Sequence, residues 1–412
     1  MTDETKAPDP SAPAAPATSA TPAATASDAP APATAPEVAP APAPAPTAAV
    51  APISAVPVPA APAAPAPIPA PAAAAAPAPA PAATGPLALV LLDIGMPDSA
   101  KDAAGWLTKL YADPHVLQTV VAGPFLDLLA WYTSLVRRSA LSSALEAVGG
   151  KAPEKAELEK LAAALAMGLG GQLSRTVQPF VAFRHASPGI EETLKQAQSA
   201  GCRRVVGLFA RTFASSAGSD SMRAALSMAA EDLPDLDVSM IDGFEDDAAI
   251  RASFAAEATR ALGAIPESER AGAHLLFLLQ GQPVKERRDP TLPRAQRFAQ
   301  AVKDAMGVAN PSTFAYQTGV DPRAPLLPDA AEEIARLAGE KRRALVLVPL
   351  SHACEGLSTR WELDLGLVKR ARELGIAHVA RAQAPSASPS FRAALEDVVR
   401  RHIEDMGRYR AA

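Results

Sequence analysis

Cysteine is scarce in this sequence. Its 412 residues include two cysteines, Cys202 and Cys354, and neither belongs to a Cys-x-x-Cys pair. Zinc knuckles and iron–sulfur clusters need several closely spaced thiolates, so neither kind of site is indicated. The first ten residues, MTDETKAPDP, are acidic and lack the apolar core of a secretory signal. We therefore expect a reduced, cytoplasmic protein.

Three further absences narrow the possible functions. No apolar run reaches the roughly 18 residues that a membrane-spanning helix needs, so no transmembrane segment is predicted. The net charge of −5 disfavours a general nucleic-acid-binding surface, because such surfaces are basic. No Gly-x-Gly-x-x-Gly follows the first apolar run, and no Gly-x-x-x-x-Gly-Lys-Ser/Thr occurs. Nucleotide binding therefore has no support.

Residues 7–83 are almost entirely alanine and proline. Proline removes a backbone hydrogen-bond donor, and alanine offers too little apolar area to form a core. We predict a disordered Pro/Ala-rich tail over residues 1–85, with a semi-rigid, polyproline-like character. It serves either as a spacer or docking arm for a partner or as a solvated segment without a specific partner.

From Pro86 onward, apolar strand-like segments alternate with amphipathic helical segments. The apolar segments read LALVLLDIG, FVAFR, RRVVGLF, DVSMIDGF, HLLFLLQG and RALVLVPL. Strands that are apolar on both faces belong to a parallel sheet covered by helices. We predict an α/β fold with two Rossmann-like parallel-sheet halves, residues 86–245 and residues 246–406 with a C-terminal helix. Ligands of such folds bind at the carboxyl ends of the strands.

The turns after these strands resemble those of ferrochelatases, which insert ferrous iron into a porphyrin to make haem. An Asn-x-Gly-Thr-Pro-Asp-Ser turn of the family is matched by residues 93–99, and Gly-Asn-Pro-x-Ile is echoed by residues 187–190. Thr-x-Gly-Ser is similar to residues 216–219, and Trp-Gln-Ser-x-x-Gly-Pro to residues 316–322. The segment after the last inner strand, which contains His-x-Glu-Thr-Leu-x-Glu-x-Asp, is similar to residues 349–364. The resemblance covers residues 86–406.

The resemblance implies a chelatase-like fold around a porphyrin cleft, with ferrous iron and porphyrin as substrates and no permanently bound cofactor. It also implies a His at the position of Gln280, a second His at Gly356 and a Glu at Ser358, and all three are replaced here. Imidazole and carboxylate groups bind ferrous iron and accept protons near neutral pH. The amide of Gln280 cannot accept a proton at ordinary pH.

Other residues of the same segment offer a relocated metal site. His352 and Glu355 lie three residues apart, and Glu362 follows in the stretch that resembles the family. His352 and Glu355 form either a displaced metal site or a polar rim that holds no metal. The spacing His-x-x-Glu is too common to choose between them.

Four residues are candidates for contact with a porphyrin. Arg184 and Arg211 end strands and either pair with the propionates through bidentate hydrogen bonds or are solvated. His185 lines the pocket or has a structural role. Phe213 belongs to residues 209–213, which match a Tyr-Pro-Gln-Tyr-Ser pocket wall of the family.

These observations predict a ferrochelatase-family protein whose iron insertion is weak or lost because Gln280 and Ser358 replace the metal-site His and Glu. If active, it is an enzyme of haem biosynthesis. The alternatives are a non-catalytic protein that binds porphyrin or haem and an interaction scaffold. The sequence sets neither the porphyrin nor the oligomeric state.

Overall fold

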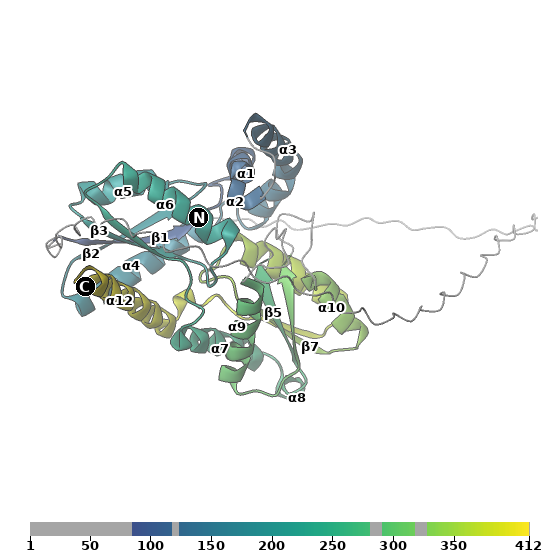
Figure 1. Cartoon of the computed structure of the whole chain (residues 1–412). Helices are drawn as coiled ribbons and strands as arrows, with labels where there is room; N and C mark the ends of the chain where they lie inside the picture. The colour runs from purple at the N-terminus through teal and green to yellow at the C-terminus, as the bar shows by residue number, and fades with distance from the viewer. Residues whose placement is uncertain (1–84, 118–122, 281–290, 318–327, 412) are drawn as a thin grey trace, which may run out of the picture. The chain divides into compact units, whose positions relative to one another are not determined.

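The computed structural model describes residues 85–117, 123–280, 291–317 and 328–411 (Figure 1). The predicted tail, the turn that follows Gln280 and most of residues 316–322 lie outside the described residues. The described chain contains two four-stranded parallel sheets. The α/β fold with two parallel sheets is therefore confirmed.

The first sheet has the strand order β2-β1-β3-β4. Its central strand β1, Leu87–Asp93, is buried along its whole length, as expected of a strand with helices on both faces. The neighbouring strands are β2 (Val177–Phe183), β3 (Arg204–Phe209) and β4 (Asp237–Ile241). Leu92 pairs with Phe209, and Asp93 pairs with Phe183, so three strands end at the same edge.

The second sheet repeats this order with later strands, β6-β5-β7-β8. Its strands are β5 (His274–Gln280), β6 (Ser312–Gln317), β7 (Ala344–Pro349) and β8 (His378–Arg381). Gln280 pairs with Gln317 at the carboxyl end of the two strands. Gln280 thus lies at the carboxyl end of an inner strand, on the rim of the sheet, as its place after an apolar run predicted.

Helices cover both sheets (Figure 1). Before the second strand come α1 (Ala103–Ala112), α2 (Pro114–Leu117), α3 (Pro124–Ala147) and α4 (Glu154–Leu173). The first sheet continues with α5 (Ile190–Ser199) and α6 (Ser221–Glu231). The later helices are α7 (Ala248–Gly263), α8 (Glu267–Arg270), α9 (Thr291–Met306), α10 (Ala330–Gly339), α11 (Lys369–Glu373) and α12 (Pro389–Ala411). A π-helix over Ser358–Val368 precedes α11.

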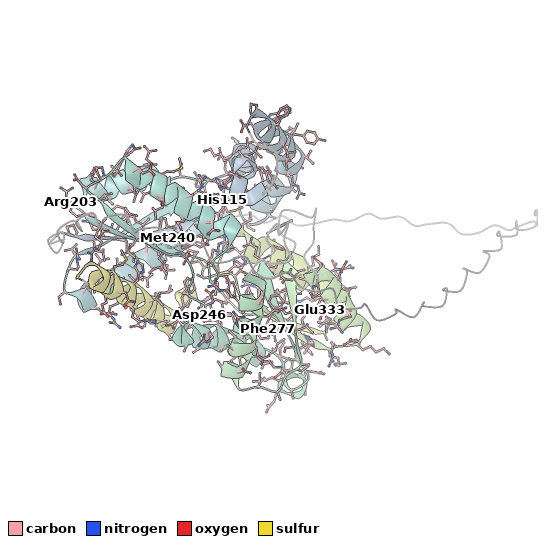
Figure 2. The ribbon with its side chains drawn as sticks, in the orientation of Figure 1. His115, Arg203, Met240, Asp246, Phe277 and Glu333 are labelled. Carbon is pink, nitrogen blue, oxygen red and sulfur yellow. The ribbon has the colours of Figure 1, made fainter. Side chains whose placement is uncertain are left out.

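One hydrophobic core contains side chains from both sheets and so joins the two halves. It includes Leu89 and Leu91 from β1 and Leu275 and Phe277 from β5, together with residues of α4, α7 and α12. Phe277 is labelled in Figure 2. A second core lies between the first sheet and α5 and α6. Burial of apolar area in the shared core fixes the two sheet edges relative to each other. No described helix combines the length and apolar character that crossing a bilayer requires.

Candidate functional site

A cavity of about 320 Å³ lies where the carboxyl ends of the two sheets meet. Asp93 of β1 and Arg211, just after β3, line it from the first sheet. Gln280 of β5 and His352, just after β7, line it from the second. Helix α3 and the segment that starts the π-helix add Arg137, Ala140, Leu141, Ala144, Leu357, Ser358, Trp361 and Glu362 to the wall.

Arg211 connects the two sheets at the floor of this cavity. Its Nη2 and Nε atoms lie 3.0 and 3.3 Å from Asp93 Oδ1. Its Nη1 donates a hydrogen bond of 2.6 Å to Gln280 Oε1. The backbone of Arg211 also joins the two halves, because it forms an isolated antiparallel bridge with His352. The side-chain oxygen of Gln280 therefore accepts a hydrogen bond from the guanidinium of Arg211, which follows a strand of the other sheet.

Ser358 lies in a small polar cluster on the second side of the cavity. Its hydroxyl donates to Glu362 Oε2 at 3.0 Å. The same Glu362 oxygen accepts a hydrogen bond of 3.2 Å from Gln317 Nε2. Gln280, Ser358 and Glu362 thus line one cavity, although the Gln280 side chain pairs with Arg211 and Ser358 pairs with Glu362.

His352 lines the cavity but is buried, with 6% of its surface exposed. Burial, together with the positive charges of Arg211 and Arg381, lowers its pKa to about 3. The imidazole is therefore neutral near pH 7. Its Nε2 atom has no hydrogen-bond partner in the described part of the chain.

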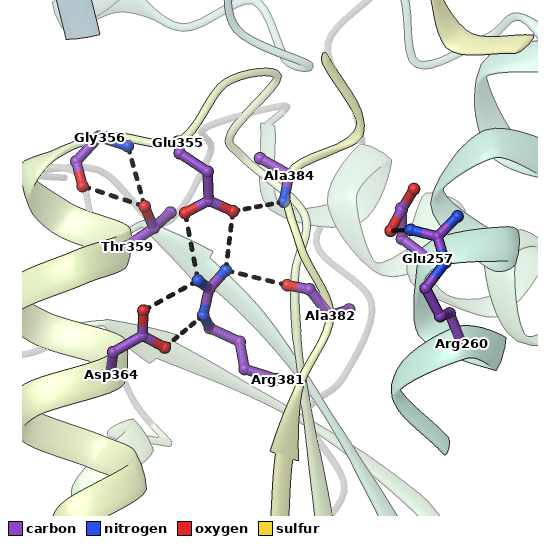
Figure 3. Close-up of polar contacts among 9 residues, drawn as sticks. All are labelled: Glu257, Arg260, Glu355, Gly356, Thr359, Asp364, Arg381, Ala382 and Ala384. Carbon is purple, nitrogen blue, oxygen red and sulfur yellow. Dashed lines mark hydrogen bonds and ion pairs between the residues drawn. The ribbon is translucent and has the colours of Figure 1, made fainter. Parts of the chain in front are cut away.

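Glu355 faces a different partner (Figure 3). Arg381 donates to both of its carboxylate oxygens, at 2.9 and 3.2 Å, and the Ala384 amide donates to Oε1 at 2.7 Å. Burial would raise the pKa of Glu355, but the hydrogen bonds and charge of Arg381 outweigh it and hold the pKa below its ordinary value. Both of its oxygens are engaged by Arg381, so the geometry does not favour His352 and Glu355 as a relocated ligand pair. Nowhere in the described ranges do three or more His, Cys, Asp or Glu side chains gather closely enough to hold a metal ion.

Three predicted porphyrin contacts lie outside the lining of the cavity. Arg184 and His185 both reach Asp113 Oδ2, at 3.2 and 3.4 Å. Burial and the charge of Arg184 lower the pKa of His185, the charge of Asp113 raises it, and the net pKa is about 4. Phe213 is buried in the shared core, where its ring packs edge-to-face on Phe298 at 5.3 Å. Of the four candidates, Arg211 alone lines the cavity.

One carboxylate of the cavity was not predicted from the sequence. Glu154 is the first residue of α4, and it lines the cavity next to the start of the π-helix. Burial raises its pKa to about 7, although a hydrogen bond from the Leu357 amide lowers it. In the sequence, a Glu after Pro153 is typical of an ordinary first helical turn, because the helix dipole favours acids there. No local signal separates it from such a residue.

The sequence matches the family model described as Ferrochelatase over residues 86–403. The chain belongs to the ferrochelatase family. The resemblance predicted from the turns is thereby confirmed at the level of the family, and ferrous iron and porphyrin are the substrates that membership implies.

Curated ferrochelatases are similar to it along most of their length. The ferrochelatase of Synechococcus elongatus is 27% identical over 327 residues, covering 78% of this chain and 83% of that protein. The ferrochelatase of Synechococcus sp. strain JA-3-3Ab is 30% identical over 326 residues, covering 76% of this chain and 93% of that protein.

Two solved structures are similar in fold. SirB from Bacillus subtilis with Fe³⁺ has a TM-score of 0.45 and 12% identity, covering 76% of this chain and 94% of that one. A multi-domain protein of Deinococcus radiodurans, described as similar to chelatases, has a TM-score of 0.41 and 14% identity. It covers 75% of this chain and 53% of that one.

Proposed function

We propose that this ferrochelatase-family protein binds a porphyrin in the cavity between its sheets and inserts ferrous iron only slowly. The observation that carries the proposal is the Arg211–Gln280 hydrogen bond of 2.6 Å. By the resemblance, Gln280 stands where intact members have a metal-site His. A guanidinium is always charged near neutral pH. It therefore repels a divalent cation from the one oxygen that Gln280 could offer.

The walls of the cavity suit a flat aromatic macrocycle. Its apolar part includes Leu141, Leu158 and Leu357. The guanidinium groups of Arg137 and Arg211 also line it and are suited to carboxylates, which arginine binds in bidentate geometry. Small-molecule sites are typically mostly apolar with a few placed polar groups. The loss of the metal-site His and Glu therefore weakens insertion more than binding.

The test has two measurements on the purified full chain, freed of host ferrochelatase. The first is the shift of the porphyrin absorbance band during a titration with a dicarboxylate porphyrin. The second is the rate of zinc- or iron-porphyrin formation. We expect saturable binding, with insertion slower than in an intact family member by roughly 10²–10⁴, the factor that a general base supplies.

Each outcome bears on one hypothesis. Absence of saturable porphyrin binding contradicts the proposal and favours the alternative of an interaction scaffold. Binding with no detectable insertion contradicts slow turnover and leaves a non-catalytic porphyrin- or haem-binding protein. Insertion near one turnover per second, within the usual range of enzymes, contradicts the inference drawn from Gln280 and Ser358.

A further inference from the structure

Glu154 lies between two cavities. The inner one is the cavity described above. The outer one, of about 370 Å³, is lined by Asp98, Lys151, Lys155 and Glu159 among others. Glu154 and Met96 line both. The carboxylate therefore stands where a group can exchange protons with a bound ligand on one side and with water on the other.

The two carboxylate oxygens of Glu154 have different surroundings. Oε1 accepts a hydrogen bond from the backbone amide of Leu357, which anchors the side chain to the start of the π-helix. Oε2 is buried and has no hydrogen-bond partner among the described residues. A buried polar atom without a partner is costly unless a ligand or water completes it. The unpartnered Oε2 is thus an observation independent of the cavity itself.

The Glu154 side chain fills the space beside Gly356 that a larger side chain at position 356 would occupy. A Cβ atom built on Gly356 would lie 2.6 Å from Glu154 Oε1 and 2.9 Å from its Cδ. Gly356 is the position at which the resemblance places the second His of the family. A His at position 356 and the observed position of Glu154 exclude each other on steric grounds. The observed placement of the Glu154 carboxylate therefore depends on the glycine at position 356.

We propose that Glu154 is the group that accepts the pyrrole protons when this protein inserts a metal into a porphyrin, an inference that rests on the proposed function. A pyrrole N–H bond breaks, its proton forms an O–H bond with the Glu154 carboxylate, and the electron pair stays on the nitrogen. That pair then binds the incoming divalent ion. The proton leaves through the outer cavity to water, and the regenerated carboxylate accepts the proton of the second pyrrole.

The electrostatic surroundings support this assignment. Burial is the largest effect on the pKa of Glu154 and raises it to about 7, where a base exchanges protons readily near neutral pH. The Leu357 amide lowers this pKa, Asp93 raises it and Arg211 lowers it.

Further charged or titratable groups line the two cavities that Glu154 faces. They are Arg137, His352, Cys354 and Glu362 in the inner cavity, and Asp98, Lys151, Lys155 and Glu159 in the outer one. Within the inner cavity His352 is no competing base, because burial lowers its pKa to about 3. Burial likewise raises the pKa of the Cys354 thiol to about 12, so this thiol stays protonated.

The test is zinc insertion into a dicarboxylate porphyrin by the full chain and by Glu154→Gln. We expect the variant to bind porphyrin with unchanged affinity and to lose insertion rate by about 10²-fold or more. Glu192→Gln is the matched control, because Glu192 is also in the first turn of a helix but is exposed on α5. Glu154→Asp keeps a carboxylate and is expected to recover part of the rate.

The pH profile separates a proton acceptor from a merely structural residue. In the unmodified chain the rate should rise as pH increases through about 7, because the carboxylate must be ionised to accept a proton. In Glu154→Gln this rise should disappear. Circular dichroism and porphyrin binding show whether each variant is folded.

The possible failures differ in meaning. Loss of porphyrin binding by the unmodified chain overturns the proposed function and this inference together. Intact binding with no insertion by the unmodified chain overturns the proposed slow insertion and this inference together. Insertion by the unmodified chain with equal rates and pH profiles for Glu154→Gln and Glu192→Gln overturns only the assignment of Glu154. If Glu154→Gln does not fold, a Glu154→Asp variant with an unchanged rate and pH profile overturns it.

Discussion

Arg211 and Arg381 lie near the same cavity and differ in how fully their charges are matched. Arg381 contacts two carboxylates, with Nε 2.6 Å from Asp364 Oδ1 and Nη1 2.9 Å from Glu355 Oε1, and only 6% of its side chain is exposed. Arg211 contacts one carboxylate, Asp93, and the neutral amide of Gln280. Its side chain is 21% exposed and lines the cavity.

The comparison indicates that Arg381 has a structural role and that Arg211 is available to the cavity. The Arg381 network is closed: Glu355 and Asp364 supply two negative charges, and the Ala382 carbonyl accepts a further hydrogen bond at 3.1 Å (Figure 3). Arg211 is one cation facing one carboxylate and a cavity. A closed buried network stabilises the fold when all its members are present. Arg211 is paired with a single carboxylate and still lines the cavity, so its guanidinium can bind anions such as porphyrin carboxylates and disfavours a metal ion beside it.

The largest expected effect comes from changing the site around Arg211. We expect Gln280→His with Ser358→Glu to raise metal insertion, because the imidazole and the carboxylate supply ligand and base together. Each change alone should do little, since such groups act as a unit. Adding Arg211→Gln, which restores the residue of the family's Tyr-Pro-Gln-Tyr-Ser wall, should bring the total gain to roughly 10²–10⁴.

Steady-state zinc-porphyrin formation measures this gain. Gln280→Asn with Ser358→Gln changes both positions without adding a base and serves as the control. If the triple variant were no faster than this control, the replaced residues would not be what limits insertion. Gly356→His is left out of the set because the Glu154 side chain fills the space beside Gly356.

The next effect is on stability and concerns Arg381. Arg381→Met leaves the half-buried Glu355 without its cation. We expect the free energy of unfolding to fall by roughly 3–5 kcal/mol, the usual cost of removing one partner of a buried ion pair. Arg370→Met on the exposed face of α11 should change it by less than about 0.5 kcal/mol. Urea denaturation measures both, and similar values for the two variants would contradict a structural role for the network.

Glu154 makes stability depend on pH. Its pKa is about 7 in the folded protein, above the ordinary 4.5, so the folded state holds the proton more tightly than the unfolded state. Stability is therefore lost as pH rises from about 4.5 to about 7, and Glu154→Gln lacks this loss. Between pH 5 and pH 8 we expect the variant to gain roughly 1–3 kcal/mol relative to the unmodified chain. A constant difference across this range would argue against a raised pKa.

The smallest effect tests the contact between Gly356 and Glu154. Gly356→Ala places a methyl group against the Glu154 carboxylate, which has to move away from the Leu357 amide. We expect a loss of about 1 kcal/mol in the free energy of unfolding, within the range for mild overpacking. In a Glu154→Ala background the loss should vanish, because the two effects are coupled. An equal loss in both backgrounds would place the strain elsewhere.

Some of the rim was predictable and some was not. Gln280 was placed at a sheet edge because apolar strands of a parallel sheet end where polar residues begin. His352 and Glu355 lie in the same segment of the chain, but the residues that they contact come from different strands. Glu355 is paired by Arg381 of β8, and His352 is flanked by Arg211 of the first sheet. Sequence spacing carries no information about partners that arrive from another strand.

The sequence by itself determined the α/β class, the two parallel sheets and the resemblance to the family. Strand periodicity and turn motifs are local, so a single chain displays them without its partners. Only the tertiary structure decided which side chains meet in the cavity. Glu154, Arg211 and Gln280 come from three distant segments, and the shared core sets their positions. The raised pKa of Glu154 arises only there, because burial and neighbouring groups, rather than residue type, shift a pKa.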